Sequence, residues 1–151
     1  MKLILNILIL AFTLCGVSAA AEAGTLTINA SAGQITKGDC LPFSTGAWTG
    51  KVNCTLMFNI PVESGKTITN VTFYYFDNAT TQSINGRVGR ISLSTLSDEI
   101  IGSTFTDSST SNSVQFTTLN VNTVTSSSYS YYAQVVLNSD TSFRGIKINY
   151  Q

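Results

Sequence analysis

The sequence predicts an all-β protein that folds as a single β-sandwich or jelly roll of about eight strands. Apolar and polar residues alternate with a period of two over several short segments, which is the pattern of half-buried strands. Gly, Pro, Asn, Asp and Ser separate these segments, as expected for turns. No stretch places apolar residues at the i, i+3, i+4 and i+7 spacing of an amphipathic helix.

The clearest strand is predicted at residues 51–60, where every second residue is apolar and Cys54 falls on the inward side. Pro61 and Gly65 mark the turn that follows, because proline cannot continue a hydrogen-bonded ladder. The next strand, residues 67–76, is rich in β-branched and aromatic residues. Alternation also predicts strands at 25–30, 128–138 and 143–150, and further strands are predicted at 83–96, 100–105 and 113–121.

The first residues have the features of a secretory signal peptide. Lys2 supplies a positive charge, residues 3–14 are almost all apolar, and small residues follow. Cleavage is predicted after Ala19 or Ala23. The apolar stretch of about 12 residues is shorter than the roughly 20 that a spanning helix needs, which argues against a retained anchor. We therefore predict export to the periplasm or the extracellular space, with no transmembrane segment after processing.

Processing also defines the mature domain and its cysteines. With residues 1–23 as the signal peptide, residues 24–151 form one domain of ordinary size. Removal of Cys15 leaves Cys40 and Cys54, an even pair in an oxidising compartment, and a disulfide between them is predicted. Two free buried thiols are the alternative.

Charged side chains are few and scattered. Lysine and arginine total 8 and aspartate and glutamate total 8, so the formal net charge is zero. This composition provides no basic stripe for phosphates, and nucleic acid is not expected as a partner. Residues 108–139 contain no charged side chain at all. Because exposed sheet edges usually carry charge, these strands are expected to be central, to rely on hydroxyl and amide groups, or to be buried in an assembly.

The sequence contains no convincing catalytic, cofactor or metal motif. It has no histidine, which removes Ser-His and Cys-His nucleophiles and most zinc sites. A Gly-x-Ser-x-Gly elbow and a Ser-x-x-Lys dyad are also missing. Only paired carboxylates remain, as in glycoside hydrolases. Asp98 and Glu99 are adjacent, however, and on a strand they would point to opposite faces. We predict a protein that is not an enzyme and needs no cofactor.

Trp48 is the residue that the sequence singles out for ligand binding. It is the only tryptophan and lies in the segment that a Cys40–Cys54 disulfide would close. An exposed indole on a rigid loop would suit stacking on a sugar ring. The alternative is that Trp48 folds back and caps the core beside the disulfide.

Two stretches of sequence carry a resemblance to a known group of proteins. The first runs from Cys40-Leu41-Pro42 through Cys54 to residues 60–77, and the second covers residues 131–150. Together they resemble a loose group of bacterial exported β-sandwich proteins of unassigned function. That resemblance implies the fold and secretion, and it implies no active site.

A second resemblance is to chaperone–usher pilins. It rests on the early Cys40, an alternating C-terminal strand and the penultimate Tyr150. It implies assembly by donation of a strand, with Leu26 and Ile28 on the inward side of the donor. Pilins place their second cysteine much farther downstream than Cys54, which counts against this resemblance.

These observations give three hypotheses for function. The first is a secreted non-enzymatic β-sandwich module that binds a ligand or surface, either carbohydrate or a cell-envelope component. The second is a pilin-like structural subunit that self-assembles by strand donation. The third is a small carboxylate-dependent glycoside hydrolase.

Overall fold

A computed structural model of the chain describes residues 22–42, 48–77, 84–105, 114–138 and 141–151. These residues form an all-β structure with one short 3-10 helix, η1 (Ala30–Ala32). The predicted signal peptide as far as Ala19 lies outside them. The strands are β1 (Gly24–Asn29), β2 (Gln34–Pro42), β3 (Trp48–Asn59), β4 (Thr67–Asp77), β5 (Asn85–Ser92), β6 (Asp98–Phe105), β7 (Gln115–Val124), β8 (Tyr129–Leu137) and β9 (Thr141–Tyr150).

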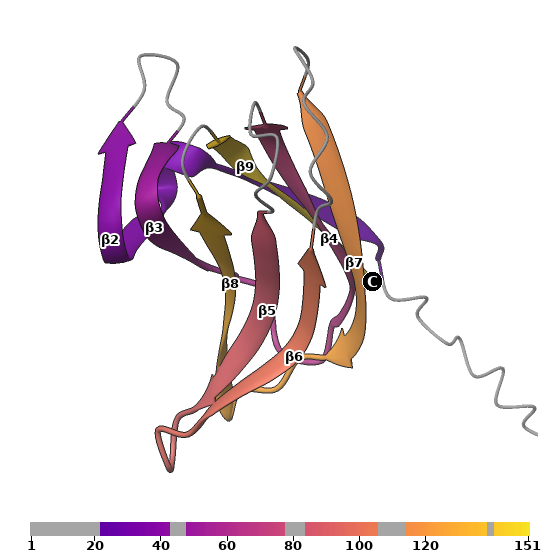
Figure 1. Cartoon of the computed structure of the whole chain (residues 1–151). Helices are drawn as coiled ribbons and strands as arrows, with labels where there is room; N and C mark the ends of the chain where they lie inside the picture. Colours follow the sequence, from indigo (N-terminus) through magenta and orange to yellow (C-terminus); the bar gives the residue numbers. More distant parts are fainter. Residues whose placement is uncertain (1–21, 43–47, 78–83, 106–113, 139–140) are drawn as a thin grey trace, which may run out of the picture.

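The strands form two antiparallel sheets that pack face to face. One sheet has the order β2-β3-β8-β5-β6, and the other has the order β1-β9-β4-β7. Figure 1 shows β3, β8, β5 and β6 side by side, with β9, β4 and β7 in the second layer. A short pairing of Trp48 and Thr49 with Phe143 and Ser142 joins the two sheets. The predicted β-sandwich is confirmed.

Phe143 lies at the centre of the core and is completely buried. Its ring centroid is 5.4 Å from that of Phe58, which comes from the opposite sheet, and 6.4 Å from that of Phe73 on the neighbouring strand. Burying a side chain of this size contributes roughly 1.5–3 kcal/mol. Around this cluster lie further fully buried residues from both sheets: Leu56, Ile68, Val71, Ile84, Val88, Val135, Leu137, Ile146 and Ile148.

Strand β2 has no counterpart among the predicted strands. Its side chains are exposed apart from Cys40, and its pairing with β3 contains three register shifts. Gly38 has a φ of 77°, a conformation that favours glycine. An irregular edge strand with one buried side chain shows no alternation of polarity, so periodicity does not detect it.

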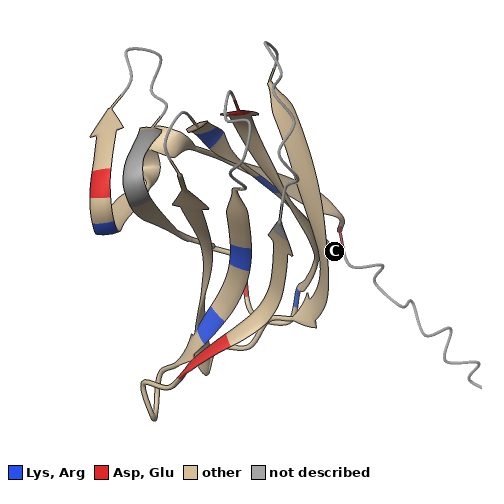
Figure 2. Ribbon diagram, viewed as in Figure 1, with Lys and Arg blue, Asp and Glu red and all other residues tan. Residues whose placement is uncertain are grey.

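The uncharged strands β7 and β8 occupy different positions (Figure 2). Strand β8 lies between β3 and β5, as expected for a central strand. Strand β7 is the edge of the four-stranded sheet, and it lies beside β6 of the other sheet. There the hydroxyl oxygens of Thr104 and Thr117 are 3.2 Å apart. Side chains of small polar residues therefore close the sandwich along this side.

None of the helical segments among the described residues is long and apolar enough to cross a membrane.

Candidate functional site

The outward face of the four-stranded sheet is a regular surface of polar residues. Residues that pair across antiparallel strands point to the same side, so the register assigns the outward positions in rows across β1, β9, β4 and β7. We call this surface the polar face. Its rows are Thr25, Asn149, Asn70 and Asn120; then Thr27, Lys147, Thr72 and Thr118; then Asn29, Gly145, Tyr74 and Phe116.

The first row of the polar face is hydrogen-bonded from strand to strand. The hydroxyl of Thr25 donates to Oδ1 of Asn149 at 2.9 Å, and Nδ2 of Asn149 donates to Oδ1 of Asn70 at 2.8 Å. Each bond fixes the orientation of an amide. An amide held in this way still has donor and acceptor capacity to offer to a ligand. The first row is therefore a preorganised set of hydrogen-bonding groups.

The second row contains a comparable pair of hydroxyls. The Oγ1 atoms of Thr72 and Thr118 lie 3.0 Å apart on β4 and β7. Thr72 is buried, whereas Thr118 is exposed. A cross-strand threonine pair of this kind also stabilises the sheet, by roughly 0.2–1 kcal/mol.

The third row ends in two aromatic rings. Tyr74 and Phe116 pair across β4 and β7, with ring centroids 6.2 Å apart and planes inclined by 44°. Phe116 is 68% exposed, although phenylalanine usually lies inside a protein. Exposed aromatic residues beside ordered polar groups are typical of ligand-binding surfaces. The pair can stack against an apolar face of a ligand while the first two rows bind its polar groups.

Gly145 allows the third row to form. Its φ is 150°, and a β-carbon at this position would lie 2.6 Å from the carbonyl oxygen of Ile28. The register of β9 against β4 shifts here, between Tyr74 and Tyr75. The glycine thus permits close approach of β1 and leaves the ring of Tyr74 without a side chain beside it on β9.

A hollow of about 300 Å³ lies at the end of the first row. Asn149 and Thr25 form part of its wall, so it is continuous with the polar face. The remaining lining comes mainly from the two ends of the domain: Ala23, Gly24, Thr69, Tyr150 and Gln151.

No pattern in the sequence alone predicts the polar face. Tyr74 and Phe116 do not stand out from the other aromatic residues of the sequence. The alternation within β4 carries a usable signal, because Asn70, Thr72 and Tyr74 fall on one side and Val71 and Phe73 on the other. The partners on the neighbouring strands are separated from them by long stretches of chain, and only the register brings them together.

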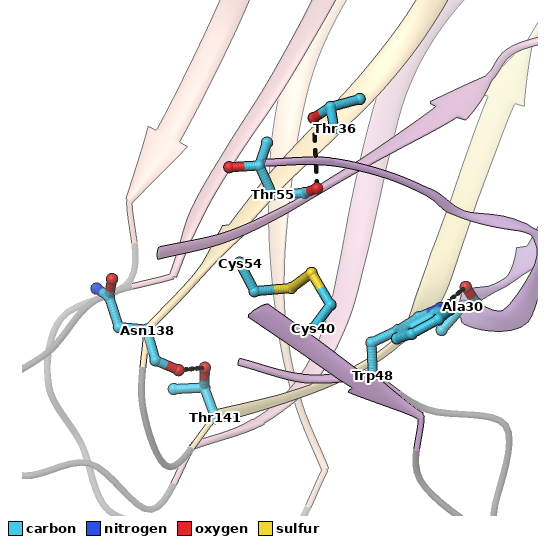
Figure 3. The surroundings of a disulfide bond; sticks show 8 residues. All are labelled: Ala30, Thr36, Cys40, Trp48, Cys54, Thr55, Asn138 and Thr141. Atoms are coloured by element: carbon cyan, nitrogen blue, oxygen red, sulfur yellow. Dashed lines mark hydrogen bonds between the residues drawn. A yellow bond between two sulfur atoms is a disulfide. The ribbon is translucent and has the colours of Figure 1, made fainter. Parts of the chain in front are cut away.

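Trp48 is the first residue of β3, and its side chain is half-buried against the core (Figure 3). Its indole Nε1 donates a hydrogen bond of 2.7 Å to the carbonyl oxygen of Ala30. The structure thus places Trp48 in contact with η1 and away from the polar face. This is the geometry expected if the indole caps the core, and a role in ligand binding stays a prediction.

Cys40 and Cys54 form the predicted disulfide, with their Cα atoms 5.0 Å apart (Figure 3). Cys54 is completely buried on the inward side of β3, and Cys40 is the buried residue of β2. The bond fastens the irregular strand β2 to the sheet. A closed loop of about this length should stabilise the fold by roughly 3 kcal/mol.

The outward face of the five-stranded sheet has a different character. Tyr132 lies there, over Gly89, and its hydroxyl donates to Oδ1 of Asp98 at 2.6 Å. Burial of the phenol, together with this hydrogen bond, raises the pKa of Tyr132 well above its ordinary value. A groove of about 170 Å³ crosses this face between Gln34 and Ile91. Tyr132, the tyrosine that lines this groove, is only 5% exposed, so its ring offers little surface to a ligand.

Two acidic residues of β6 already have partners. Oε2 of Glu99 accepts a hydrogen bond of 2.8 Å from Nε of Arg90. The same oxygen forms an ion pair with Nη2 of Arg90, also at 2.8 Å. This interaction raises the pKa of the Arg90 guanidinium, which also lies 4.3 Å from the ring centroid of Tyr129. Asp98 pairs with Ile91 and Glu99 with Arg90, so the two carboxylates lie on opposite faces, as their adjacency predicts. Within the described part of the chain, no group of three His, Cys, Asp or Glu residues could hold a metal ion.

Comparison with known proteins identifies the fold. No protein-family model matches the chain, and none of the curated proteins matches it. Among solved structures, the chain is similar to the CBM36-1 domain of a multidomain xylanase from the hindgut metagenome of Trinervitermes trinervoides. The TM-score is 0.55 and the identity 15%, over 83% of this chain and 96% of that one.

Two further structures show the same similarity. The C-terminal CBM6 of LamC, a marine laminarinase from Zobellia galactanivorans, gives a TM-score of 0.53 and 14% identity over 83% of this chain and 98% of that chain. The CBM22-1–GH10 modules of the Clostridium thermocellum xylanase 10B, complexed with xylohexaose, give a TM-score of 0.56 and 10% identity. There the match covers 85% of this chain but only 28% of that chain. The chain thus has the β-sandwich fold that these carbohydrate-binding modules share.

Proposed function

We propose that this protein is a secreted, non-catalytic β-sandwich module that binds carbohydrate on the polar face. The observation that carries the proposal is the hydrogen-bonded row of Thr25, Asn149 and Asn70 on the same face as the ring pair of half-buried Tyr74 and exposed Phe116. Sugars present hydroxyl groups at their edges and C–H groups on their ring faces. Fixed amides and hydroxyls match the first, and exposed aromatic rings match the second.

The fold and the acidic residues support this proposal. The three solved structures described above are carbohydrate-binding modules or contain one, and one was solved with xylohexaose. Asp98 and Glu99 are held by Tyr132 and Arg90, and Asp77 is completely buried. These acids are poorly placed to act as the acid and nucleophile of a glycosidase. A module that binds without turnover fits the residues better.

Secretion is part of the proposal and rests on residues 1–23. The mature chain should begin at Ala20 or Gly24. The intact mass of the secreted protein tests this, and a mass that still included residues 3–14 would contradict it. Release at Gly24 would place the new terminus at the first residue of β1, beside Tyr150.

Affinity gel electrophoresis of the secreted protein tests carbohydrate binding. The probes are soluble xylan, mannan, mixed-linkage β-glucan and polygalacturonate, and pull-down on cellulose and on isolated cell envelopes covers insoluble ligands. The double variant Y74A/F116A should reduce the affinity for any polysaccharide retained by the wild type about tenfold or more, a loss of about 1.4 kcal/mol. The control is Leu96→Ser, which removes a side chain that is 78% exposed on another part of the surface.

If no polysaccharide or envelope fraction binds the wild-type protein, the proposal is wrong. If the polysaccharide retains the double variant as strongly as the wild type, the binding site does not lie at the aromatic pair of the polar face. Self-assembly by strand donation is the competing hypothesis. Within this chain, however, β1 already pairs with β9 over Gly24–Asn29. A monomer in size-exclusion chromatography would support the binding module.

A further inference from the structure

Lys147 lies in the middle of the polar face. It pairs with Thr27 on β1 and with Thr72 on β4, so the residues on both sides carry hydroxyl groups. Its side chain is half-buried between these strands. Within the described part of the chain, the ammonium group forms no ion pair or hydrogen bond. Hydroxyl neighbours can orient a ligand near this charge, but they do not neutralise it.

Among the described residues of the four strands, no acidic side chain lies in the three rows of the polar face around Lys147. The four strands β1, β9, β4 and β7 include one acidic residue, Asp77, which is completely buried at the end of β4. Their two basic residues are Lys147 and Arg144, and Arg144 already has an interaction partner (Figure 2). The acidic residues of β6, Asp98 and Glu99, belong to the other sheet. Lys147 is therefore the only charged side chain in the three rows of the polar face.

We propose that the polar face prefers glycans that carry an anionic group, a uronate carboxylate or a sulfate ester, and that Lys147 is the counter-charge. This inference rests on the proposed function and names its ligand class. The first row would bind sugar hydroxyls and the aromatic pair a ring face, which leaves the ammonium between them for the anionic substituent. Opposite charges attract each other more strongly at a protein surface of lowered dielectric constant than in bulk water.

Titration of the secreted protein with oligosaccharides of matched length tests this preference. Oligogalacturonides provide the carboxylate, sulfated galactan oligosaccharides provide the sulfate ester, and xylo-oligosaccharides are the neutral probe. Lys147→Gln removes the charge and Lys147→Arg keeps it. Lys37→Gln is the matched control, because Lys37 is an exposed lysine on β2 of the opposite sheet. Thermal unfolding of each variant checks that it is folded.

The wild type should bind one of the two anionic probes at least about tenfold more tightly than the neutral probe, and rising salt should weaken that binding. Lys147→Gln should abolish the preference while neutral binding changes less than about twofold, and Lys147→Arg should largely keep it. Lys37→Gln should behave as wild type. Comparison of the two anionic probes distinguishes carboxylate from sulfate.

Equal binding of neutral and anionic probes by the wild type would overturn this inference and leave the proposed function in place. A preference that survives in Lys147→Gln would overturn the role of Lys147. Failure of all probes to bind, neutral ones included, would instead count against the proposed function itself.

Discussion

Asn149 donates a hydrogen bond of 2.8 Å from its Nδ2 atom to Oδ1 of Asn70, across strands β9 and β4. The two residues are 79 positions apart in the sequence, and both are half-buried on the polar face. Asn149 also accepts the hydroxyl of Thr25, so one amide holds three strands in register on their outward side.

Replacement of this amide should affect both stability and binding. Asn149→Ala leaves Thr25 and Asn70 without their partner, and it should lower the free energy of unfolding by about 1 kcal/mol. It should also reduce glycan affinity. Urea denaturation and affinity electrophoresis measure the two effects. Asn59→Ala, on the outward face of the other sheet, is the control and should leave glycan affinity unchanged. An equal loss of affinity in both variants would contradict the assignment of the site.

The disulfide should account for a substantial part of the stability. Reduction of the Cys40–Cys54 bond removes the constraint on a loop that spans 14 positions, and it should lower the free energy of unfolding by about 3 kcal/mol. Urea denaturation with and without a reductant measures this, with the double variant C40A/C54A as a second test. Peptide mapping first establishes that the bond is intact. If the free energy of unfolding is then unchanged by reductant, the prediction is wrong.

Gly145 should tolerate no side chain. Gly145→Ala adds a β-carbon 2.6 Å from the carbonyl oxygen of Ile28, so the pairing of β1 with β9 should be weakened. Gly65→Ala is the matched control, because Gly65 also has a positive φ, 87°, but has no atoms within 4 Å of the added carbon. Backbone strain alone should cost the control roughly 1–2 kcal/mol. A larger loss of stability in Gly145→Ala, measured by thermal unfolding, is the expected result.

Tyr132 should make the fold sensitive to alkaline pH. Burial and the hydrogen bond to Asp98 raise its pKa in the folded state above the ordinary value of 10.0. In the unfolded chain the phenol loses its proton near that pH, whereas the folded protein retains it. Its contribution to stability is therefore fully present below about pH 10 and declines as the pH rises further.

The measurement is the free energy of unfolding between about pH 8 and pH 11. Tyr132→Phe should show a shallower decline than the wild type. Tyr74→Phe removes a phenol from the other sheet and is the control. Identical pH profiles for wild type and Tyr132→Phe would refute the coupling.

Substitution of Trp48 distinguishes the two roles that the sequence left open, ligand binding and capping of the core. Trp48→Phe keeps most of the buried ring but loses the hydrogen bond to the carbonyl oxygen of Ala30, which should cost about 1 kcal/mol of stability. If the indole only packs, glycan affinity should be that of the wild type. Loss of affinity at unchanged stability would instead assign Trp48 to ligand binding.

The sequence by itself determined the fold class and most of the strands. Alternation of polarity predicted β3, β8 and β9 because one side of each of these strands faces the core, and β-branched and aromatic residues predicted β4. The sequence also predicted the disulfide, because processing leaves Cys40 and Cys54 as an even pair and Cys54 falls on the inward side of its strand. Strand β2 escaped detection because a bulged edge strand buries almost nothing. These features depend on residues close together in the chain or on simple pairing rules.

Only the tertiary structure decided where the polar face lies. Asn70, Phe116 and Asn149 are unremarkable in the sequence, and they meet because β9 pairs with β4 and β4 pairs with β7. The register of those pairings depends on the packing of Phe143, Phe73 and the other core residues, which no local pattern specifies. Trp48 illustrates the same limit, because its choice between solvent and core depends on the carbonyl of Ala30, a contact set by how η1 folds against β3.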